Sequence, residues 1–158
     1  MAATIESAIA AAREDEFLAS LTLFLDIYGT AEAPPIKSPK SAAGLSWFGL
    51  CVALVRKEYR ASIDLCRRAI DLEFYNGDHY ANLARIYSVM GMRKKAVETA
   101  DQGLRLAPEH PYLREVRRSL GVRARPAVPF LDRTNPINVS LGQARHAKKT
   151  ADRERKKR

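Results

Sequence analysis

The side chains best suited to catalysis or metal binding are scattered along this sequence. Its three histidines, His79, His110 and His146, fall in three different segments, and its two cysteines, Cys51 and Cys66, stand on apolar stretches. A metal site or a nucleophilic centre needs such groups at short, recurring spacings, such as His-x-x-x-His or Cys-x-x-Cys. No spacing of that kind occurs, and there is no glycine-rich phosphate loop. We therefore expect no enzymatic activity, no metal and no cofactor.

Positive charge is the second chemical feature, and it is concentrated at one end of the chain. The formal net charge is +9; residues 1–108 contain 13 Lys or Arg and 13 Asp or Glu, whereas residues 109–158 contain 14 and 5. The last 16 residues, 143–158, hold eight Lys or Arg and almost no large apolar side chain. Such a segment buries too little surface to offset its ordering entropy. We expect a basic flexible tail, or at most a frayed helix.

The tail could neutralise several phosphates, with an affinity that falls steeply with salt. It has no aromatic residue to stack on bases, so it would bind by charge alone. A nucleic acid or ribosome, an anionic membrane surface and an acidic protein would all attract it, and a purely solubilising role is equally compatible. The residues expected to contact an anionic partner are Lys148, Lys149, Arg153, Arg155, Lys156, Lys157 and Arg158.

The rest of the sequence favours a cytoplasmic protein. The two cysteines lack disulfide-framework spacing and are expected to be free, buried thiols. The N-terminus has no basic segment and carries Glu6 early, unlike a secretory signal. The most apolar run, Phe17 to Tyr28, has 12 residues and includes Asp26, whereas a membrane span needs roughly 20. No transmembrane segment is predicted.

The elements that must position any site are predicted to be helices. Over residues 3–28, apolar side chains such as Ile5, Ile9 and Leu25 recur at three- and four-residue steps, which predicts one helix ending at Gly29. A proline-rich loop follows over residues 30–41.

Residues 43–108 contain an internal repeat, which is the strongest sign of organisation in the sequence. At an offset of 35 residues, the first predicted helix of each pair aligns, with Phe48 on Leu83 and Gly49 on Ala84. At an offset of 34 residues, the second helices align, with Ser62 on Ala96 and Ile70 on Leu104. Small residues let antiparallel helices approach, and large ones fill the space between them. The pattern predicts two helix pairs, about 43–74 and 77–108, which must stack to bury their apolar faces.

The pattern changes twice after Pro108. Pro111 suits a first helical position and Gly121 suits a position just past a helix end, so residues 111–120 are predicted to form a capping helix. This completes a helical domain over residues 1–121. Residues 122–142 are predicted to form an extended, proline-rich arm, and we hypothesise that Phe130 and Leu131 in it pack back over the helix pairs.

The second pair carries a family resemblance. Its signature residues are Tyr80, Leu83, Ala84, Tyr87, Gly91, Ala96, Gly103, Leu104 and Pro108. This set resembles the tetratricopeptide repeat (TPR), a 34-residue helix–turn–helix unit. The first pair is a degenerate version, and the chain is similar to small bacterial TPR proteins. The resemblance implies an all-α fold of stacked helical hairpins, a short α-solenoid.

The resemblance also implies protein–protein interaction. TPR arrays hold a peptide or partner helix along a concave face lined by first helices, which here would present Trp47, Asp78, Asn82 and Arg85. The sequence therefore predicts a non-catalytic scaffold or adaptor that binds a partner in this groove. The alternative is a nucleic-acid- or ribosome-associated factor that docks through the basic tail.

Overall fold

Helices are the only regular elements among the residues that the computed structural model describes, 3–29, 41–121 and 135–155. The helices are α1 (Ile5–Arg13), α2 (Phe17–Tyr28), α3 (Ser41–Val55), α4 (Tyr59–Leu72), α5 (Gly77–Val89), α6 (Arg93–Leu106), α7 (Pro111–Leu120) and α8 (Pro136–Arg155). The chain forms two compact units, Met1–Gly121 and Val122–Arg158. The predicted all-α class of stacked helical hairpins is confirmed. None of the described helices combines the length and apolar composition that crossing a membrane requires.

The N-terminal segment is a helical hairpin, so the prediction of one helix over 3–28 is wrong. α1 begins at a capping box in which Thr4 and Ser7 bond each other's backbone N–H groups. It ends at Arg13, and Asp15 adopts a left-handed conformation (φ 62°) that turns the chain back into α2. Aspartate tolerates this conformation better than most side chains. The Ser20 hydroxyl donates to the carbonyl of Ala8 at 2.7 Å and ties α2 to α1.

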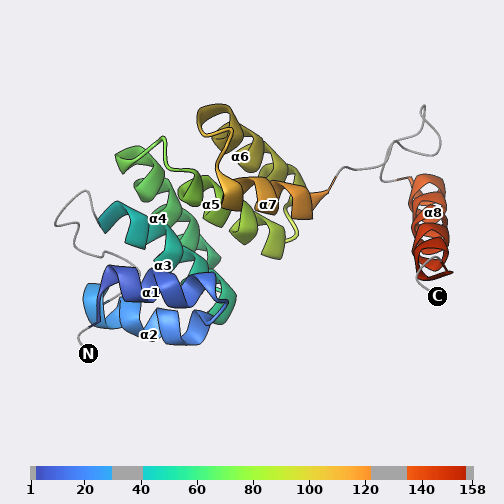
Figure 1. The fold of residues 1–158 in the computed structure, drawn as a ribbon. Coiled ribbons are helices and arrows are strands. Elements are labelled where there is room, and N and C mark those ends of the chain that lie inside the picture. The colour runs from blue at the N-terminus through green and yellow to red at the C-terminus, as the bar shows by residue number, and fades with distance from the viewer. Residues whose placement is uncertain (1–2, 30–40, 122–134, 156–158) are drawn as a thin grey trace. The chain divides into compact units, whose positions relative to one another are not determined.

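The helices of the first unit stack as a short solenoid (Figure 1). α1 and α2, α3 and α4, and α5 and α6 form three hairpins, and α7 packs on both α5 and α6. The first helices of successive hairpins contact one another, giving a row α1–α3–α5–α7. α4 packs on α5 and α2 on α3. Among the described helices, each contacts only its near neighbours, as expected for a repeat array.

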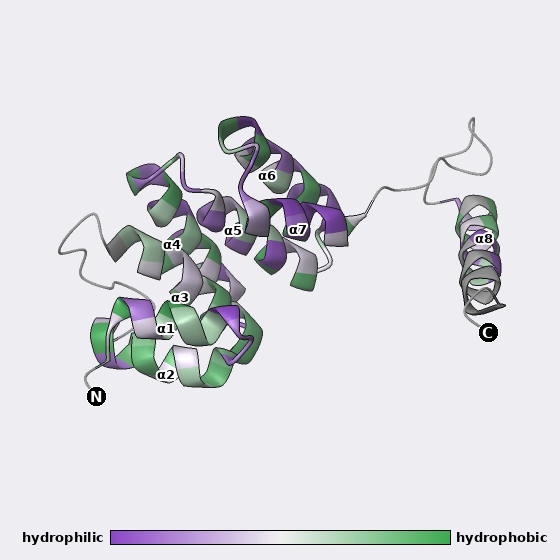
Figure 2. Ribbon diagram, in the orientation of Figure 1, coloured by the Kyte–Doolittle hydropathy of each residue, from purple (hydrophilic) through white to green (hydrophobic). Residues whose placement is uncertain are grey.

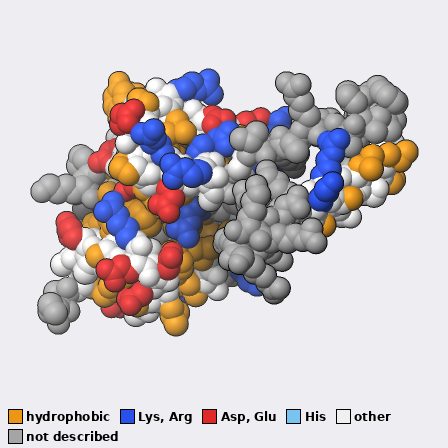
Figure 3. All heavy atoms as spheres, turned by 45° about the vertical axis from the view of Figure 1, so that its right-hand side comes forward, with side chains coloured by type: hydrophobic (Ala, Val, Ile, Leu, Met, Phe, Trp, Pro, Cys, Tyr) orange, Lys and Arg blue, Asp and Glu red, His pale blue; other side chains and the backbone are white. Residues whose placement is uncertain are grey.

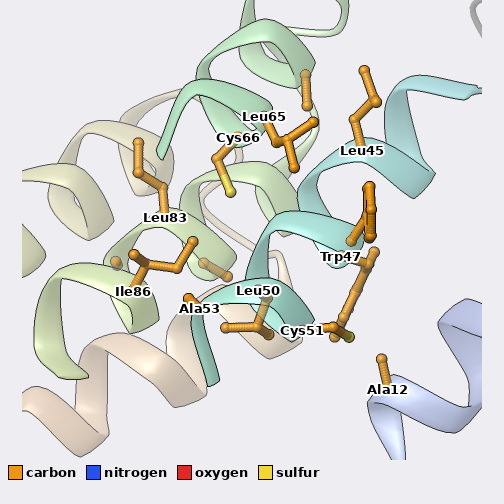
Figure 4. Close-up of a cluster of buried hydrophobic side chains, with 14 of the residues drawn as sticks. Ala12, Leu45, Trp47, Leu50, Cys51, Ala53, Leu65, Cys66, Leu83 and Ile86 are labelled. Carbon is orange, nitrogen blue, oxygen red and sulfur yellow. The ribbon is translucent and has the colours of Figure 1, made fainter. Parts of the chain in front are cut away.

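α3 is the centre of the core. Its residues from Leu45 to Ala53 are all buried, and Figure 2 shows α2 and α3 as the more apolar part of the unit. Phe48 packs on Phe24 and Tyr28 of α2 with ring centroids 5.6 and 5.5 Å apart. On other sides of α3, side chains of α4 and α5 such as Leu65 and Ile86 complete the cluster (Figure 4). Each such large side chain contributes about 1.5–3 kcal/mol by burial.

Glycine is required where paired helices approach most closely. A Cβ on Gly49 would lie 2.8 Å from the carbonyl oxygen of Ser62, and a Cβ on Gly103 would lie 2.5 Å from Cβ of Tyr80. These small positions are two of those that the repeat pattern singles out.

The second unit contains α8, so residues 136–142 are helical where an extended arm was predicted, and residues 143–155 are helical where a flexible tail or at most a frayed helix was predicted. Pro136 occupies the start of the helix, and the Asn135 side chain accepts from the Ile137 N–H at 3.0 Å. Beyond residue 142 the sequence is rich in Ala, Arg and Lys, which are strong helix formers. The arm segment with Phe130 and Leu131 lies outside the described residues.

Candidate functional site

An open cavity of about 730 Å³ lies on the first unit. Its wall comes from the turn between α1 and α2 and from α3, α5 and α7, the last three being consecutive members of the first-helix row. The lining residues are Arg13, Asp15, Trp47, Asp78, Arg85, His110, Pro111, Tyr112, Glu115, Val116 and Ser119. The cavity is therefore built from segments that are far apart in the sequence.

Helix caps fix the positions of two polar residues in this wall. Asn76 is the N-cap of α5, and its side chain accepts from the N–H of Asp78 at 3.1 Å. His110 is the N-cap of α7, and its Nδ1 accepts from the N–H of Leu113 at 3.4 Å. Capping leaves the carboxylate of Asp78 and the Nε2 atom of His110 free to face each other, 3.5 Å apart.

Asp78 is the electrostatic centre of the cavity wall. Its Oδ2 accepts from Nη2 of Arg13 at 3.0 Å and from Nε1 of Trp47 at 3.4 Å. Its Oδ1 is buried and accepts no hydrogen bond of ordinary geometry from the described residues, although Nε2 of His110 lies 3.5 Å away. A residue that is only 8% exposed thus keeps one carboxylate oxygen without a hydrogen bond.

An aromatic pair forms the neighbouring part of the wall. The rings of Trp47 and Tyr112 stack with centroids 5.2 Å apart and planes 19° from parallel. The guanidinium of Arg13 lies over the Trp47 ring, 5.6 Å from its centroid. Stacked aromatic rings beside a guanidinium provide a rigid surface with low conformational entropy.

Arg85 connects the cavity to the α1–α2 hairpin. It donates to the Tyr112 hydroxyl at 3.0 Å, approaches Asp15 at 3.7 Å and lies over the Phe17 ring, 5.3 Å from its centroid. Burial raises the pKa of the Tyr112 hydroxyl, and the charge of Arg85 partly offsets this rise. Tyr112 therefore stays a neutral hydrogen-bonding group at physiological pH.

A chain of buried polar groups runs inward from Tyr112. Its hydroxyl donates to Oδ1 of Asn82 at 3.0 Å, and Nδ2 of Asn82 donates to the Ser46 hydroxyl at 3.3 Å. Oγ of Ser46 lies 2.8 Å from Nδ1 of His79, whose Nε2 lies 3.3 Å from a Glu73 carboxylate oxygen. Burial lowers the pKa of His79 despite the nearby carboxylate, which favours a neutral imidazole.

This chain has the group types of a nucleophilic relay, serine, histidine and glutamate. Ser46 and His79 have no exposed surface, however, and a nucleophile must reach the atom it attacks. The chain instead joins α3, α5 and α7 by hydrogen bonds between their facing sides. Among the described side chains, no group of three or more His, Cys, Asp and Glu is placed to hold a metal ion.

Three of the four predicted groove residues, Trp47, Asp78 and Arg85, line the cavity together, although Trp47 is itself only 1% exposed. The fourth, Asn82, is fully buried in the polar chain beneath it and presents no surface to a partner. Sequence reasoning missed Arg13, which reaches the cavity from the end of α1. This omission follows from the wrong prediction of one continuous helix over residues 3–28, in which Arg13 lay mid-helix and not at a helix end beside the groove.

The cavity residues of α7 were also missed. They include His110, Tyr112 and Glu115, on a helix that was predicted only as a cap. Pro111 at its first position and the apolar stripe ending in Leu120 indicated the helix, but not its contact with α5. As the fourth member of the first-helix row, α7 forms one side of the cavity.

The predicted anionic-partner residues belong to the second unit. Lys148 is exposed on α8. The backbone of α8 also includes Lys149, Arg153 and Arg155, whereas residues 156–158 lie outside the described residues. Over the first unit, Figure 3 shows Lys and Arg side chains interspersed with Asp and Glu on the face in view, without a large area of one sign.

Comparisons with known proteins bear on the fold. No protein-family model matches the chain, and no curated protein does. Among solved structures, a TPR-repeat chain in the crystal structure of the APC/C hetero-tetramer Cut9-Hcn1 is similar, with a TM-score of 0.55 and 14% identity. The match covers 74% of this chain and 22% of that one, so the present chain spans about a fifth of its length. The chain has a TPR-like fold.

Proposed function

We propose that this protein binds a peptide or helical segment of a partner protein in the cavity along α3, α5 and α7. The observation that carries the proposal is the composition of the cavity wall. The half-buried Tyr112, backed by the buried Trp47 ring, offers apolar contact area, and Asp78 and Arg85 offer directed polar contacts. Binding sites combine apolar area with a few placed polar groups in this way.

Rigid support beneath the wall favours the same role. Tyr112 is held by Arg85 and Asn82, and Trp47 by its hydrogen bond to Asp78. Side chains held in place before binding lose little entropy when a partner arrives. The polar chain between the helices thus serves to preorganise the aromatic pair.

A charge-reversal pair tests the proposal. Glu115 is exposed and lines the cavity, and Glu98 is exposed on α6, outside the cavity. Partners would be captured from an extract of the source cells by the full chain and by Glu115→Arg and Glu98→Arg variants. We expect Glu115→Arg to lose the captured partner and Glu98→Arg to retain it. Equal capture by both variants would contradict the groove proposal.

Electrostatic docking through the tail remains the competing interpretation, and a truncation separates the two. A chain ending at residue 142 lacks eight Lys or Arg residues. Capture through the cavity should survive the truncation and change little between low and moderate salt. Capture that disappears on truncation, falls steeply with salt and is sensitive to RNase would favour the tail instead.

A further inference from the structure

Asp78 carries an unmet hydrogen-bonding capacity into the cavity wall. Of its two carboxylate oxygens, Oδ2 accepts from Arg13 and Trp47, and Oδ1 accepts from no described group. The nearest candidate donor to Oδ1 is Nε2 of His110 at 3.5 Å. A buried carboxylate oxygen without a donor is costly, so this position suits a ligand that brings N–H groups.

Arg13 shows which ligand group fits. Its guanidinium makes two contacts at once, to the Asp78 carboxylate at 3.0 Å and over the Trp47 ring at 5.6 Å from the centroid. Its side chain is nevertheless 60% exposed, whereas that of Asp78 is 11% exposed, so Arg13 is the member of the pair that a competing ligand can reach. Arg13 therefore occupies a guanidinium-shaped position from which it can be displaced.

We infer that the cavity binds an arginine side chain of the partner segment, which replaces Arg13 on Asp78 and on the Trp47 ring. This inference rests on the proposed function. Oδ1 and the Trp47 ring are buried while Arg13 is in place, so the arriving guanidinium takes the contacts that Arg13 vacates. It then presents two parallel N–H groups, one to each carboxylate oxygen. Arginine fits better than lysine because its planar guanidinium can stack on an aromatic ring and donate two parallel hydrogen bonds to a carboxylate.

The remaining charges of the wall agree with a cationic ligand group. Glu115 adds an exposed carboxylate on α7. Arg85, the other guanidinium in the wall, is already engaged by Tyr112 and Asp15 and lies over Phe17. An acidic ligand group would meet Asp78 and Glu115 instead, which disfavours it.

The single tryptophan provides the measurement. Because Trp47 is the only tryptophan in the chain, its fluorescence reports on this cavity alone. The full chain would be titrated with three acetylated, amidated eight-residue peptides that differ only at one central position. That position is arginine, its neutral isostere citrulline, or glutamate. We expect the arginine peptide to bind about tenfold more tightly than the citrulline peptide, from its charge-assisted hydrogen bonds.

Three variants should change peptide binding in three different ways. Asp78→Asn should remove the preference for arginine over citrulline. Arg13→Gln should strengthen binding of the arginine peptide about threefold to tenfold, because the internal competitor is gone. Glu115→Gln, a matched carboxylate-to-amide change at an exposed wall position, should weaken it only slightly. Thermal melts would show that each variant is folded, and Arg13→Gln alters an exposed side chain, so its result stands even if Asp78→Asn unfolds.

The outcomes distinguish this inference from the groove proposal. Equal binding of the arginine and citrulline peptides, or weaker binding by Arg13→Gln, would overturn the arginine inference and leave the groove proposal intact. Failure of every peptide to perturb Trp47, in wild type and in Arg13→Gln, would also overturn it. The groove proposal is judged separately by the Glu115→Arg and Glu98→Arg pair.

Discussion

The two sides of α3 contrast in chemistry. Toward α2 its contacts are mainly aromatic, with Phe48 against Phe24 and Tyr28, beside one Cys51–Ser20 hydrogen bond. Toward α5 and α7 its contacts are polar or mixed, with Ser46 bonded to His79 and Asn82, and Trp47 against Tyr112. Both sides are buried, yet only the polar side continues into the cavity wall.

This difference between the two sides of α3 suggests that one side serves stability and the other serves recognition. Apolar burial stabilises a fold without fixing a particular orientation, whereas a satisfied buried polar network holds its members in one arrangement. The polar side costs desolvation energy that its hydrogen bonds offset. It holds Tyr112, which the proposed partner would contact, in a fixed position against the buried Trp47 ring.

The largest expected effect lies on the aromatic side. Phe48→Ala removes the ring that α2 packs against, and we expect a loss of about 3–5 kcal/mol in the free energy of unfolding. Urea denaturation followed by circular dichroism measures it. A loss below about 1 kcal/mol would mean that α2 and α3 do not share the packed interior described above.

A smaller effect is expected on the polar side. Asn82→Ala leaves the Tyr112 hydroxyl and the Ser46 hydroxyl without their shared partner, at a cost of about 1–3 kcal/mol. Unlike Phe48→Ala, it should also alter Trp47 fluorescence in the folded protein, because Tyr112 loses its support. If Asn82→Ala lowers stability but leaves Trp47 emission unchanged, then this network does not position the aromatic pair.

The third effect depends on pH. Burial lowers the pKa of His79 below its ordinary 6.5, and the charge of Glu73 only partly opposes this. Below pH 6.5 the unfolded chain therefore binds a proton that the folded chain does not, so stability falls as the pH drops through the lowered pKa. The melting temperature between pH 8 and pH 5 measures the effect.

Variants at two histidines assign this pH dependence. His79→Gln should flatten the decline, and His110→Gln, at the partly exposed N-cap of α7, should retain it. The same slope in wild type and His79→Gln would show that the buried histidine is not its source.

The smallest effects are expected in the hairpin turns. Lys57 has a left-handed conformation (φ 61°), and Gly91 has one at φ 74° in the next hairpin. Lys57→Gly should stabilise the fold by about 0.5–1 kcal/mol, because glycine adopts this conformation without strain. Gly91→Ala should destabilise it by about 1 kcal/mol. A Cβ on Gly91 meets nothing within 4 Å, so a thermal melt would report backbone strain alone.

The sequence was informative where side-chain size repeats. Ala84, Ala96 and Gly103 mark close helix contacts, and these spacings sufficed to predict the hairpin class. The break at Asp15 was missed because its acidic neighbours fit the polar face of one long helix. Residues 15–20 (Asp-Glu-Phe-Leu-Ala-Ser) nevertheless parallel residues 57–62 (Lys-Glu-Tyr-Arg-Ala-Ser), and that likeness was the available signal for a third hairpin.

The candidate site was predictable only in part. Helical position placed Trp47, Asp78 and Arg85 on the first-helix row. It did not reveal that Asn82 is buried, because the hydroxyl that bonds it belongs to Tyr112, 30 residues further along the chain. Such pairings depend on how α7 packs on α5, which no local pattern encodes.

The neighbour-only packing of the first unit has a consequence for its motion. In backbone packing α1 and α2 meet no described helix beyond α3, and side-chain contacts such as Arg13–Asp78 and Arg85–Phe17 link them to α5. We therefore expect this terminal hairpin to detach while the rest of the stack stays folded. Detachment would carry away Arg13 and Asp15 and so open one wall of the cavity without global unfolding. Local opening at one end of the array would thereby admit or release a bound segment, and amide hydrogens of α1 would exchange faster than those of α3.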